Sequence, residues 1–286
     1  MPIIEEPAAR RDRFLAAYDA QLRTEAEVRS ARTVTRIGPL WLAAWERSCG
    51  FVTYRSLEGM DEAGVRVLVG RALARFAADP DIEEVEWKTR AHDAAPGLAQ
   101  ALADAGFEAE PPESIMVGEA ALLAQDLALP DGVTLRRITA ERDIRAMAEM
   151  ESRVFHDDSY VARVPQLVDE ARDGQDAELW VAEARLPDGG AQMVCAGRLE
   201  PVAGTDFAGL WCGGTLAEWR GRGIYRALTA ARARSALARG KTLLNADCTE
   251  MSRPILERSG LVKVSETTPW TWRRQGRERA ADGGEP

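Results

Sequence analysis

A short stretch rich in glycine and arginine, residues 220–225 (RGRGIY), has the residue types and spacing of an anion-binding turn. Gly221 and Gly223 permit a tight turn and leave no Cβ in the way of a phosphate. Because the stretch lies between a predicted strand and a predicted helix, unpaired backbone N–H groups and the helix dipole would converge on one point. Arg220 and Arg222 add positive charge, so the stretch predicts a pyrophosphate site.

Two other phosphate-binding patterns are excluded at this place. A dinucleotide fingerprint, G-x-G-x-x-G, would need a third glycine where Arg226 stands. A Walker A loop also fails, because Ser235 occupies the position of its first glycine ahead of the run Gly240-Lys241-Thr242. A bare helix entry with two permissive glycines stays the alternative to a phosphate site.

The elements that must position this turn are predicted from hydrophobic periodicity and from turn residues. In the C-terminal half, helices are expected over 140–155, 163–173, 224–239 and 252–259. Strands are expected over 133–138, 178–186, 192–202, 207–215, 241–248 and 261–272. The glycine-rich turn then follows the strand 207–215 and opens the helix 224–239.

The N-terminal half shows a similar alternation of elements. Helices are expected over 7–29, 61–78 and 96–105, and strands over 33–37 with a continuation at 40–45, 51–57 and 82–88. Prolines at 111, 112 and 130 interrupt the pattern between the halves. We therefore expect two domains, residues 1–125 and 126–286, and the length of 286 residues agrees with two.

The two halves also echo each other in sequence. Arg71-Ala72-Leu73 matches Arg226-Ala227-Leu228 at an offset of 155, and Gly106-Phe107 matches Gly260-Leu261 at an offset of 154. Each match spans helix, strand, short helix and a glycine followed by an apolar residue. We interpret this as an internal repeat, with chance recurrence in an alanine-rich chain as the alternative.

Composition narrows the class of protein. A net charge of −9 and a pI near 5.0 argue against a nucleic-acid surface and fit a neutral or cationic small substrate better. The four cysteines lie apart without C-x-x-C spacing, so we expect reduced thiols and no metal. We find no bilayer-length apolar run and no signal core at the N-terminus, and expect a cytoplasmic protein without membrane association.

At the glycine-rich turn the sequence resembles the GNAT superfamily of acyl-CoA N-acyltransferases. The family signature has Gln or Arg, two variable residues, Gly, one variable residue, and Gly or Ala. Arg220 and Gly223 fill the first two defined places, and Tyr225 departs from the third. The resemblance covers about residues 133–273 and implies an α/β fold with a mixed, mostly antiparallel central sheet flanked by helices.

The resemblance also implies where acetyl-CoA binds. The pyrophosphate contact falls on the turn and the first helical residues, and the pantetheine contact on the end of the preceding strand, where glycines leave the backbone sterically open. The cofactor-binding residues implied are Gly213, Gly214, Thr215, Arg220, Gly221, Arg222, Gly223, Ile224, Tyr225 and Arg226.

The N-terminal half resembles the later part of the same fold. The positions that the offset of 155 aligns with the turn are residues 65–70, a largely apolar run that cannot form a phosphate cradle. The resemblance therefore implies a tandem GNAT protein with a degenerate N-terminal copy and one working site.

The residues of the chemical step are not fixed by the resemblance. Many family members protonate the thiolate with a tyrosine four residues before the terminal Gly-Phe, but Leu256 stands there. Thr249 and Ser252 are hydroxyl substitutes that also suit helix caps, and Tyr225 is a further candidate. For the general base we name Glu200, then Asp247 and Glu250.

The acceptor side is expected in the connection between the first two helices of the C-terminal half. There His156, Asp157 and Asp158 offer groups for an ammonium ion, with a polar loop as the alternative. Cys212 is expected to be a buried strand residue rather than an acyl nucleophile.

Together these observations predict an N-acetyltransferase that moves the acetyl group of acetyl-CoA to a primary amine of a small molecule. The amine would attack directly in a ternary complex, and proximity would carry much of the rate. Two alternatives stay open: an acyltransferase that uses aminoacyl-tRNA, and a non-catalytic CoA-binding sensor. The acceptor and the oligomeric state are not specified by the sequence.

Overall fold

The computed structural model describes residues 5–45, 48–173, 176–187 and 189–274. The chain divides into two compact units, and each consists of two separate segments of the sequence. Unit 1 consists of residues 1–21 and 114–264, and unit 2 of residues 22–113 and 265–286. The predicted boundary between residues 125 and 126 therefore falls inside unit 1, because the strand that precedes it pairs within the sheet of that unit.

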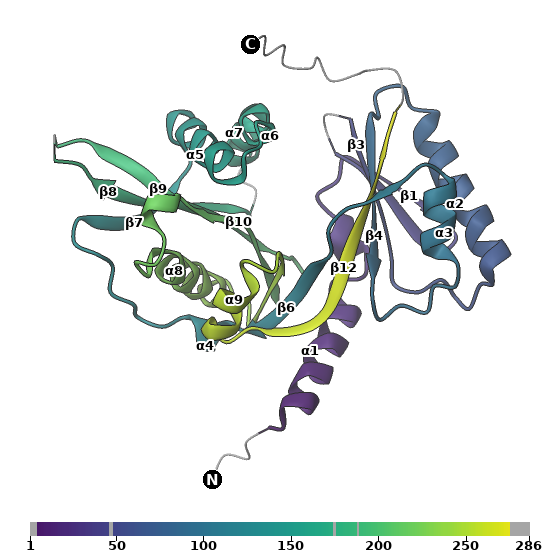
Figure 1. Cartoon of the computed structure of the whole chain (residues 1–286), viewed down its shortest axis with the longest axis horizontal. Helices are drawn as coiled ribbons and strands as arrows, with labels where there is room; N and C mark the ends of the chain where they lie inside the picture. The colour runs from purple at the N-terminus through teal and green to yellow at the C-terminus, as the bar shows by residue number, and fades with distance from the viewer. Residues whose placement is uncertain (1–4, 46–47, 174–175, 188, 275–286) are drawn as a thin grey trace, which may run out of the picture. The chain divides into compact units, whose positions relative to one another are not determined.

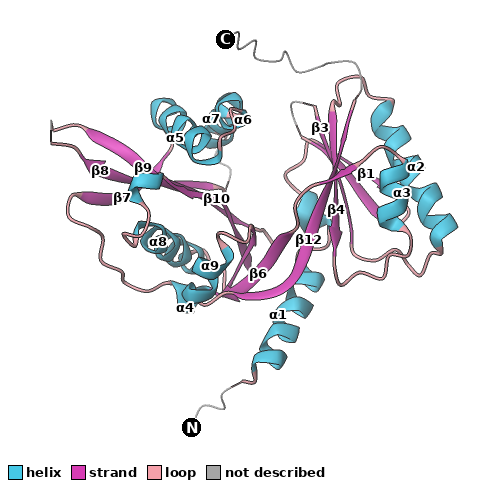
Figure 2. Cartoon of the chain, in the orientation of Figure 1, coloured by secondary structure: helices cyan, strands magenta, loops and turns pink. Residues whose placement is uncertain are grey.

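Unit 2 is a small sheet covered by helices. Its helices are α2 (Glu62–Ala77) and α3 (Leu98–Asp104), with a 3₁₀ turn at Glu25–Val28. Its strands are β1 (Thr33–Ile37), β2 (Leu40–Ala44), β3 (Cys49–Tyr54), β4 (Glu84–Arg90), β5 (Glu108–Ala109) and most of β12 (Val262–Arg273). The strand order is β1-β2-β3-β4-β12, with β5 on β12, and only β3 and β4 run parallel. Helices α2 and α3 cover one face (Figure 2).

Unit 1 contains the C-terminal elements together with the first helix of the chain. Its helices are α1 (Pro7–Gln21), α4 (Ala120–Leu123), α5 (Glu141–Phe155), α6 (Ser159–Ala162), α7 (Val164–Arg172), α8 (Ile224–Ala238) and α9 (Arg253–Ser259). Its strands are β6 (Glu113–Glu119), β7 (Val133–Ile138), β8 (Glu178–Arg185), β9 (Ala191–Pro201), β10 (Phe207–Thr215) and β11 (Leu243–Cys248). A 3₁₀ turn, Ala217–Trp219, precedes α8.

The sheet of unit 1 has the order β6-β11-β10-β9-β8-β7. Only β10 and β11 are parallel, and their pairing covers Phe207–Gly209 against Leu243–Asn245 although both strands continue. Figure 1 shows α5, α6 and α7 on one face of this sheet and α8 and α9 on the other. The segment that connects β10 to α8 therefore follows the point at which β10 and β11 separate.

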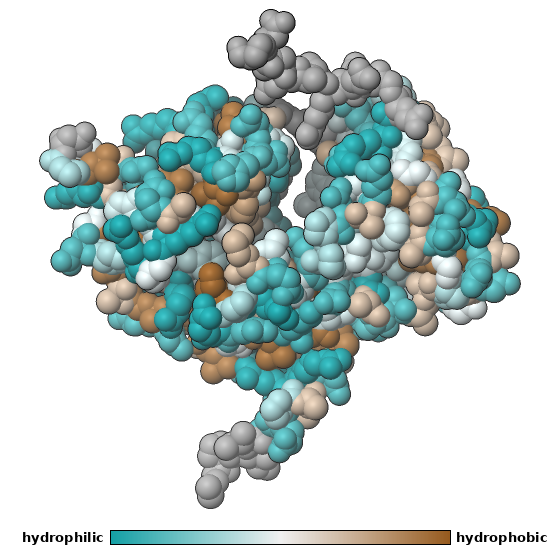
Figure 3. Space-filling view, in the orientation of Figure 1, coloured by the Kyte–Doolittle hydropathy of each residue, from teal (hydrophilic) through white to brown (hydrophobic). Residues whose placement is uncertain are grey.

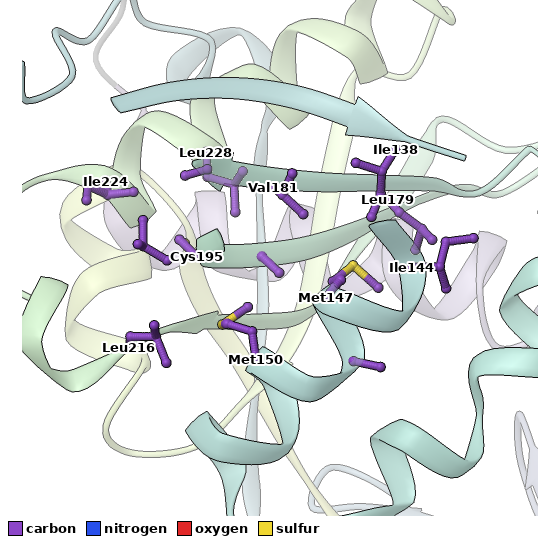
Figure 4. Packing of buried hydrophobic residues seen from close by; sticks show 14 of the residues in the cluster. Ile138, Ile144, Met147, Met150, Leu179, Val181, Cys195, Leu216, Ile224 and Leu228 are labelled. Carbon is purple, nitrogen blue, oxygen red and sulfur yellow. The ribbon is translucent and has the colours of Figure 1, made fainter. Parts of the chain in front are cut away.

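Apolar side chains fill both faces of this sheet. Ile144, Met147 and Met150 of α5 belong to one hydrophobic cluster with Val181 and Cys195 of the strands (Figure 4). Leucines and alanines of α8, β10 and β11 form a second cluster on the other face. Hydrophilic residues cover most of the face of unit 1 visible in Figure 3, with apolar residues in small patches.

Most predicted elements are present within two residues of their expected bounds, and two differences matter. Strand β6 was not predicted, because its flanking prolines were interpreted as a linker; its apolar residues Ile115, Met116 and Val117 are fully buried and pair with β11. The predicted helix over 7–29 ends at Gln21, where the Gln21 side chain bonds Asp206 and Leu22 begins a separate segment.

The internal repeat is present as an order of elements, with a different register from the one predicted. Each unit contains a parallel strand pair joined by a helix, followed by a short helix that ends at a left-handed glycine, Gly106 or Gly260. Arg71 lies in the middle of α2, whereas Arg226 lies in the first turn of α8. The Arg-Ala-Leu match therefore does not align the two helix starts.

Asp61 occupies the place in unit 2 that corresponds to the glycine-rich turn. It is the N-cap of α2, and its carboxylate accepts a 2.8 Å hydrogen bond from the backbone N–H of Gly64. A carboxylate at a helix N-terminus uses the donors and the dipole that a phosphate would need. The expectation that this half offers no phosphate cradle keeps its support, but through Asp61 and not through residues 65–70.

Candidate active site

The glycine-rich turn lies at the N-terminus of α8, as expected. Gly223 is the N-cap with φ of 78°, and Gly221 has φ of 75°, a left-handed conformation that favours glycine. A Cβ added at either glycine would meet nothing within 4 Å. The glycines are therefore required by the backbone conformation, and the space in front of them is open.

Most backbone amides of this turn have no acceptor among the described residues. Arg220 N–H bonds Ala217, and Ala227 N–H bonds Gly223 in the first turn of the helix. Within the described residues, no hydrogen bond is formed by the N–H groups from Gly221 to Arg226. Open amides at the positive end of a fifteen-residue helix are the kind of donors that anions bind in proteins.

Arg220 and Arg222 both hold the turn in place. Arg220 Nε donates to the carbonyl of Thr215 at the end of β10, at 3.1 Å. Arg222 donates to the carbonyl of Glu218 at 3.0 Å, and its guanidinium lies 4.6 Å from the centre of the Trp219 ring. Their charges stay beside the open amides while their donors fix the loop that connects β10 to α8.

The end of β10 is irregular where it passes the turn. Its register with β9 shifts between Trp211 and Gly214, a β-bulge, and Cys212 adopts φ of 51°. A Cβ on Gly213 would lie 2.8 Å from the Tyr225 ring, and one on Gly214 would lie 2.8 Å from Val154. Close packing explains these two glycines, so the expectation that they leave open space for pantetheine needs correction.

Tyr225 lies on the α8 side of the bulge. Its phenol is next to Gly213, and the ring packs against both hydrophobic clusters of unit 1. Burial raises the pKa of the phenol, and the guanidinium of Arg232 offsets part of that rise. The phenol therefore stays protonated at neutral pH beside the bulge in β10.

Arg232 of α8 is fully buried against the neighbouring strand β9. Its guanidinium donates to the carbonyl of Arg198 at 3.1 Å and to Thr229 Oγ1 at 3.2 Å, and it lies against Gly197. No carboxylate of the described chain forms an ion pair with it. A buried cation of this kind favours negative charge on the Tyr225 oxygen.

On the opposite face of β10 a pocket lies under α5, α6 and α7. Cys212, at the bulge, contributes to its wall, so the pocket and the open turn flank the same strand end. Its lining consists of Met147, Glu151, Tyr160, Arg163, Leu167, Leu179, Arg198 and Cys212.

Glu151 is the residue of this pocket that sequence reasoning missed. Its side chain is 3% exposed, and it has no hydrogen bond or ion pair within the described residues. Burial raises the pKa of its carboxyl to about 7, against the influence of Arg163 and Arg198. The sequence around Glu151, which includes the charged residue Arg153, does not distinguish this buried glutamate from one on the surface.

Arg198 connects the pocket to Glu200, a predicted general base. It lies 2.6 Å from Glu200 and 3.0 Å from Glu170, so its guanidinium is held by two carboxylates. Cys212 is a half-buried strand residue, and desolvation, together with Glu151, raises the pKa of its thiol, which therefore stays protonated at neutral pH and is a poor nucleophile. Glu200 is held by an arginine, whereas Glu151 is not.

Other predicted catalytic residues lie outside the pocket. Asp247 is half-buried in β11 opposite Ile115 of β6, and exposed Glu250 pairs with Arg253. Thr249 and Ser252 belong to the turn before α9, where the Ser252 N–H donates to the Thr249 carbonyl and the Ser252 side chain forms no cap. Their proposed roles stay predictions.

Leu256 packs in a hydrophobic cluster, and the residues expected on the acceptor side form local contacts. Leu256 is buried in the cluster beside α8. His156, in the left-handed region, ends α5; Asp157 accepts from the Ser159 N–H and hydroxyl, and Asp158 accepts from Ser152. The contacts of this exposed run are those of a polar loop that leads to Tyr160 of α6 in the pocket wall, and its role toward an acceptor stays a prediction.

Comparison with known proteins identifies the fold. No family model matches the sequence, and no match among curated proteins is found. The structure of a GCN5-related N-acetyltransferase from Kribbella flavida is similar, with 18% identity, a TM-score of 0.62, and coverage of 96% of this chain and 98% of that one. A GCN5-related N-acetyltransferase from Sphaerobacter thermophilus has 17% identity, a TM-score of 0.59, and coverage of 84% and 79%.

A tandem GNAT protein from the clavulanic acid biosynthesis pathway matches over 93% of this chain and 97% of its own, with 15% identity and a TM-score of 0.59. The chain therefore has the GNAT acetyltransferase fold, over a length similar to that of a tandem GNAT protein. The predicted α/β class, with mixed and mostly antiparallel strands flanked by helices in each half, is confirmed.

The described ranges contain neither a helix suited to cross a membrane nor a cluster of metal ligands. None of the helices there combines the length and apolarity that a bilayer crossing requires. In the same part of the chain, no group of three or more His, Cys, Asp or Glu residues is arranged to hold a metal ion.

The burial of Glu151 predicts a stability change that depends on pH. Because the folded pKa is raised above the usual 4.5, charge on Glu151 penalises the fold as pH rises, by about 3 kcal/mol above pH 7. Glu151→Gln should therefore stabilise the protein at pH 8 and much less near pH 4.5, as measured by urea unfolding. Glu149→Gln, exposed on the same helix, should change little at either pH; equal effects of both variants would contradict the assignment.

Proposed function

We propose that this protein is an acyl-CoA N-acyltransferase that transfers the acetyl group of acetyl-CoA to a primary amine of a small molecule. The observation that carries the proposal is the row of open amides from Gly221 to Arg226 at the start of α8. These donors would bind the pyrophosphate of CoA, and Arg220 and Arg222 would add charge. The fold shared with GCN5-related N-acetyltransferases supports the same assignment.

The path of the acyl arm is proposed along β10. Beyond Gly209 this strand pairs only with β9 in the described sheet, so its β11 side offers backbone groups between the turn and the bulge. Pantetheine amides would pair with that edge near Gly214 and Thr215. The thioester would then lie at the bulge, between Tyr225 on one face and the pocket on the other.

Glu151 is the general base in this proposal, in place of Glu200 and Asp247. At neutral pH a base with a pKa near 7 is present both as the carboxylate and as the protonated acid. The carboxylate form removes the proton of the incoming ammonium. The nitrogen then attacks the thioester carbon, a C–N bond forms, and the C–S bond breaks. The Tyr225 phenol gives its proton to the departing thiolate, and the second proton lost by the nitrogen restores the phenol through solvent.

The first test addresses the turn. Gly223→Asp places a carboxylate in front of the open amides, at a residue type that tolerates the left-handed region, and should abolish acetyl-CoA binding. At about 100 times its dissociation constant, acetyl-CoA should stabilise the wild type by about 2.7 kcal/mol, measured as a rise in melting temperature.

Gly240→Asp is the matched control for that variant. Gly240 has φ of 74°, and its added Cβ also meets nothing within 4 Å, but it lies after the C-terminus of α8. This control should lose a similar amount of stability and keep the acetyl-CoA shift. A Gly223→Asp protein that keeps the shift would place the cofactor elsewhere.

The second test addresses the base. The value of kcat/KM should fall as pH drops below about 7, because Glu151, which faces Arg163, Arg198, Tyr160 and Cys212 in the pocket, becomes protonated. Glu151→Gln should lower kcat about 100-fold and remove this dependence, with acetyl-CoA affinity unchanged. A Glu151→Gln profile that still declines below pH 7 would assign the base to another residue.

The third test addresses the proton donor. Tyr225→Phe keeps the packing against Gly213 and removes the hydroxyl, so kcat should fall about 100-fold at unchanged acetyl-CoA affinity. Tyr54→Phe, a buried tyrosine of unit 2, should leave kcat unchanged. Full turnover by Tyr225→Phe would show that water protonates the thiolate.

A further inference from the structure

The pocket under α5 contains two arginines in different situations. Arg198 is held between Glu170 at 3.0 Å and Glu200 at 2.6 Å. Arg163, at the junction of α6 and α7, uses its backbone N–H to bond Ser159 and Tyr160, but its guanidinium forms no hydrogen bond or ion pair in the described part of the chain. The pocket therefore has one cation with unused donors.

Glu151 provides the opposite charge in the same pocket. It is 97% buried, comes from a different element, and has no partner either. Arg163 acts on it through space, yet the two groups are not within the 4.0 Å of an ion pair. Buried carboxylates are normally paired or hydrogen-bonded, so an unpaired acid beside an unpaired guanidinium points to a ligand that bonds both.

We propose that the acceptor is a zwitterion of the amino-acid class, whose ammonium group binds Glu151 and whose carboxylate binds Arg163. This inference rests on the proposed function and names the class of its amine. The apolar side chains of Met147, Leu167 and Leu179 complete the pocket and favour an acceptor with an apolar side chain.

Charge balance separates this acceptor from a simple amine. An ammonium ion alone would neutralise Glu151 and leave Arg163 beside a second cation, which costs free energy at intermediate dielectric. A carboxylate on the same molecule removes that repulsion, and a guanidinium binds it through two parallel hydrogen bonds. Once Glu151 has taken the proton, the carboxylate keeps the amino nitrogen near the thioester.

The test measures binding by calorimetry, on the full chain saturated with CoA, so that no turnover is required. Apolar amino acids such as leucine, methionine and phenylalanine are each compared with their methyl esters and with the amines that lack the carboxylate. At least one amino acid should bind tenfold or more tightly than both of its analogues. Arg163→Gln should remove this preference, with little effect on binding of the plain amines.

Arg145→Gln is the matched control, because Arg145 is exposed on α5 and pairs only with Glu141; it should keep the preference. The proposal is overturned if the amines or esters bind as tightly as the amino acids, if none of the amino acids binds at millimolar concentration, or if Arg163→Gln retains the preference. The rise in melting temperature with acetyl-CoA reports separately on the turn. A wild-type protein without this rise refutes the proposed function. A wild-type protein that shows the rise but has no preference for amino acids refutes only this inference.

Discussion

The separation of β10 from β11 after Gly209 determines where the groups of the candidate site lie. While two strands stay paired, their backbone donors and acceptors are used, and no ligand can join the ladder. Here β10 continues to Thr215 with one free side, and its bulge turns Cys212 toward the pocket and Gly213 toward Tyr225. The end of this strand thus lies between the N-terminus of α8 and the pocket under α5.

The same arrangement buries ionisable groups that lower the stability of the fold. Glu151 and Arg232 are both buried ionisable groups without an ion-pair partner among the described residues, and each such group costs stability. They come from helices on opposite faces of the sheet (Figure 1), Glu151 beside the place proposed for the amine and Arg232 beside Tyr225. A negative group that forms at the strand end would meet the Arg232 field, and a positive one in the pocket would meet Glu151.

Features that depend on local sequence were predictable, and features that depend on packing between distant segments were not. The turn was predictable because backbone conformation at Gly221 and Gly223 is a local property, and strand β10 was predicted with its observed bounds. Glu151 was not, since its burial and pKa arise from α7 and β9 packing around α5, which are distant in sequence. Strand β6 was missed because its prolines resemble a linker until β11 is placed beside it.

The two units show how one repeated plan supports one candidate site. Unit 2 has the parallel pair β3 and β4 and the connecting helix α2, but Asp61 caps that helix with its own carboxylate. Unit 1 has glycine at the same place, and its amides stay open. An internal carboxylate is always present at high effective concentration, so it outcompetes a free phosphate. Substituting a glycine for a capping residue is therefore the step that makes a helix entry available to a ligand, at the cost of a cap.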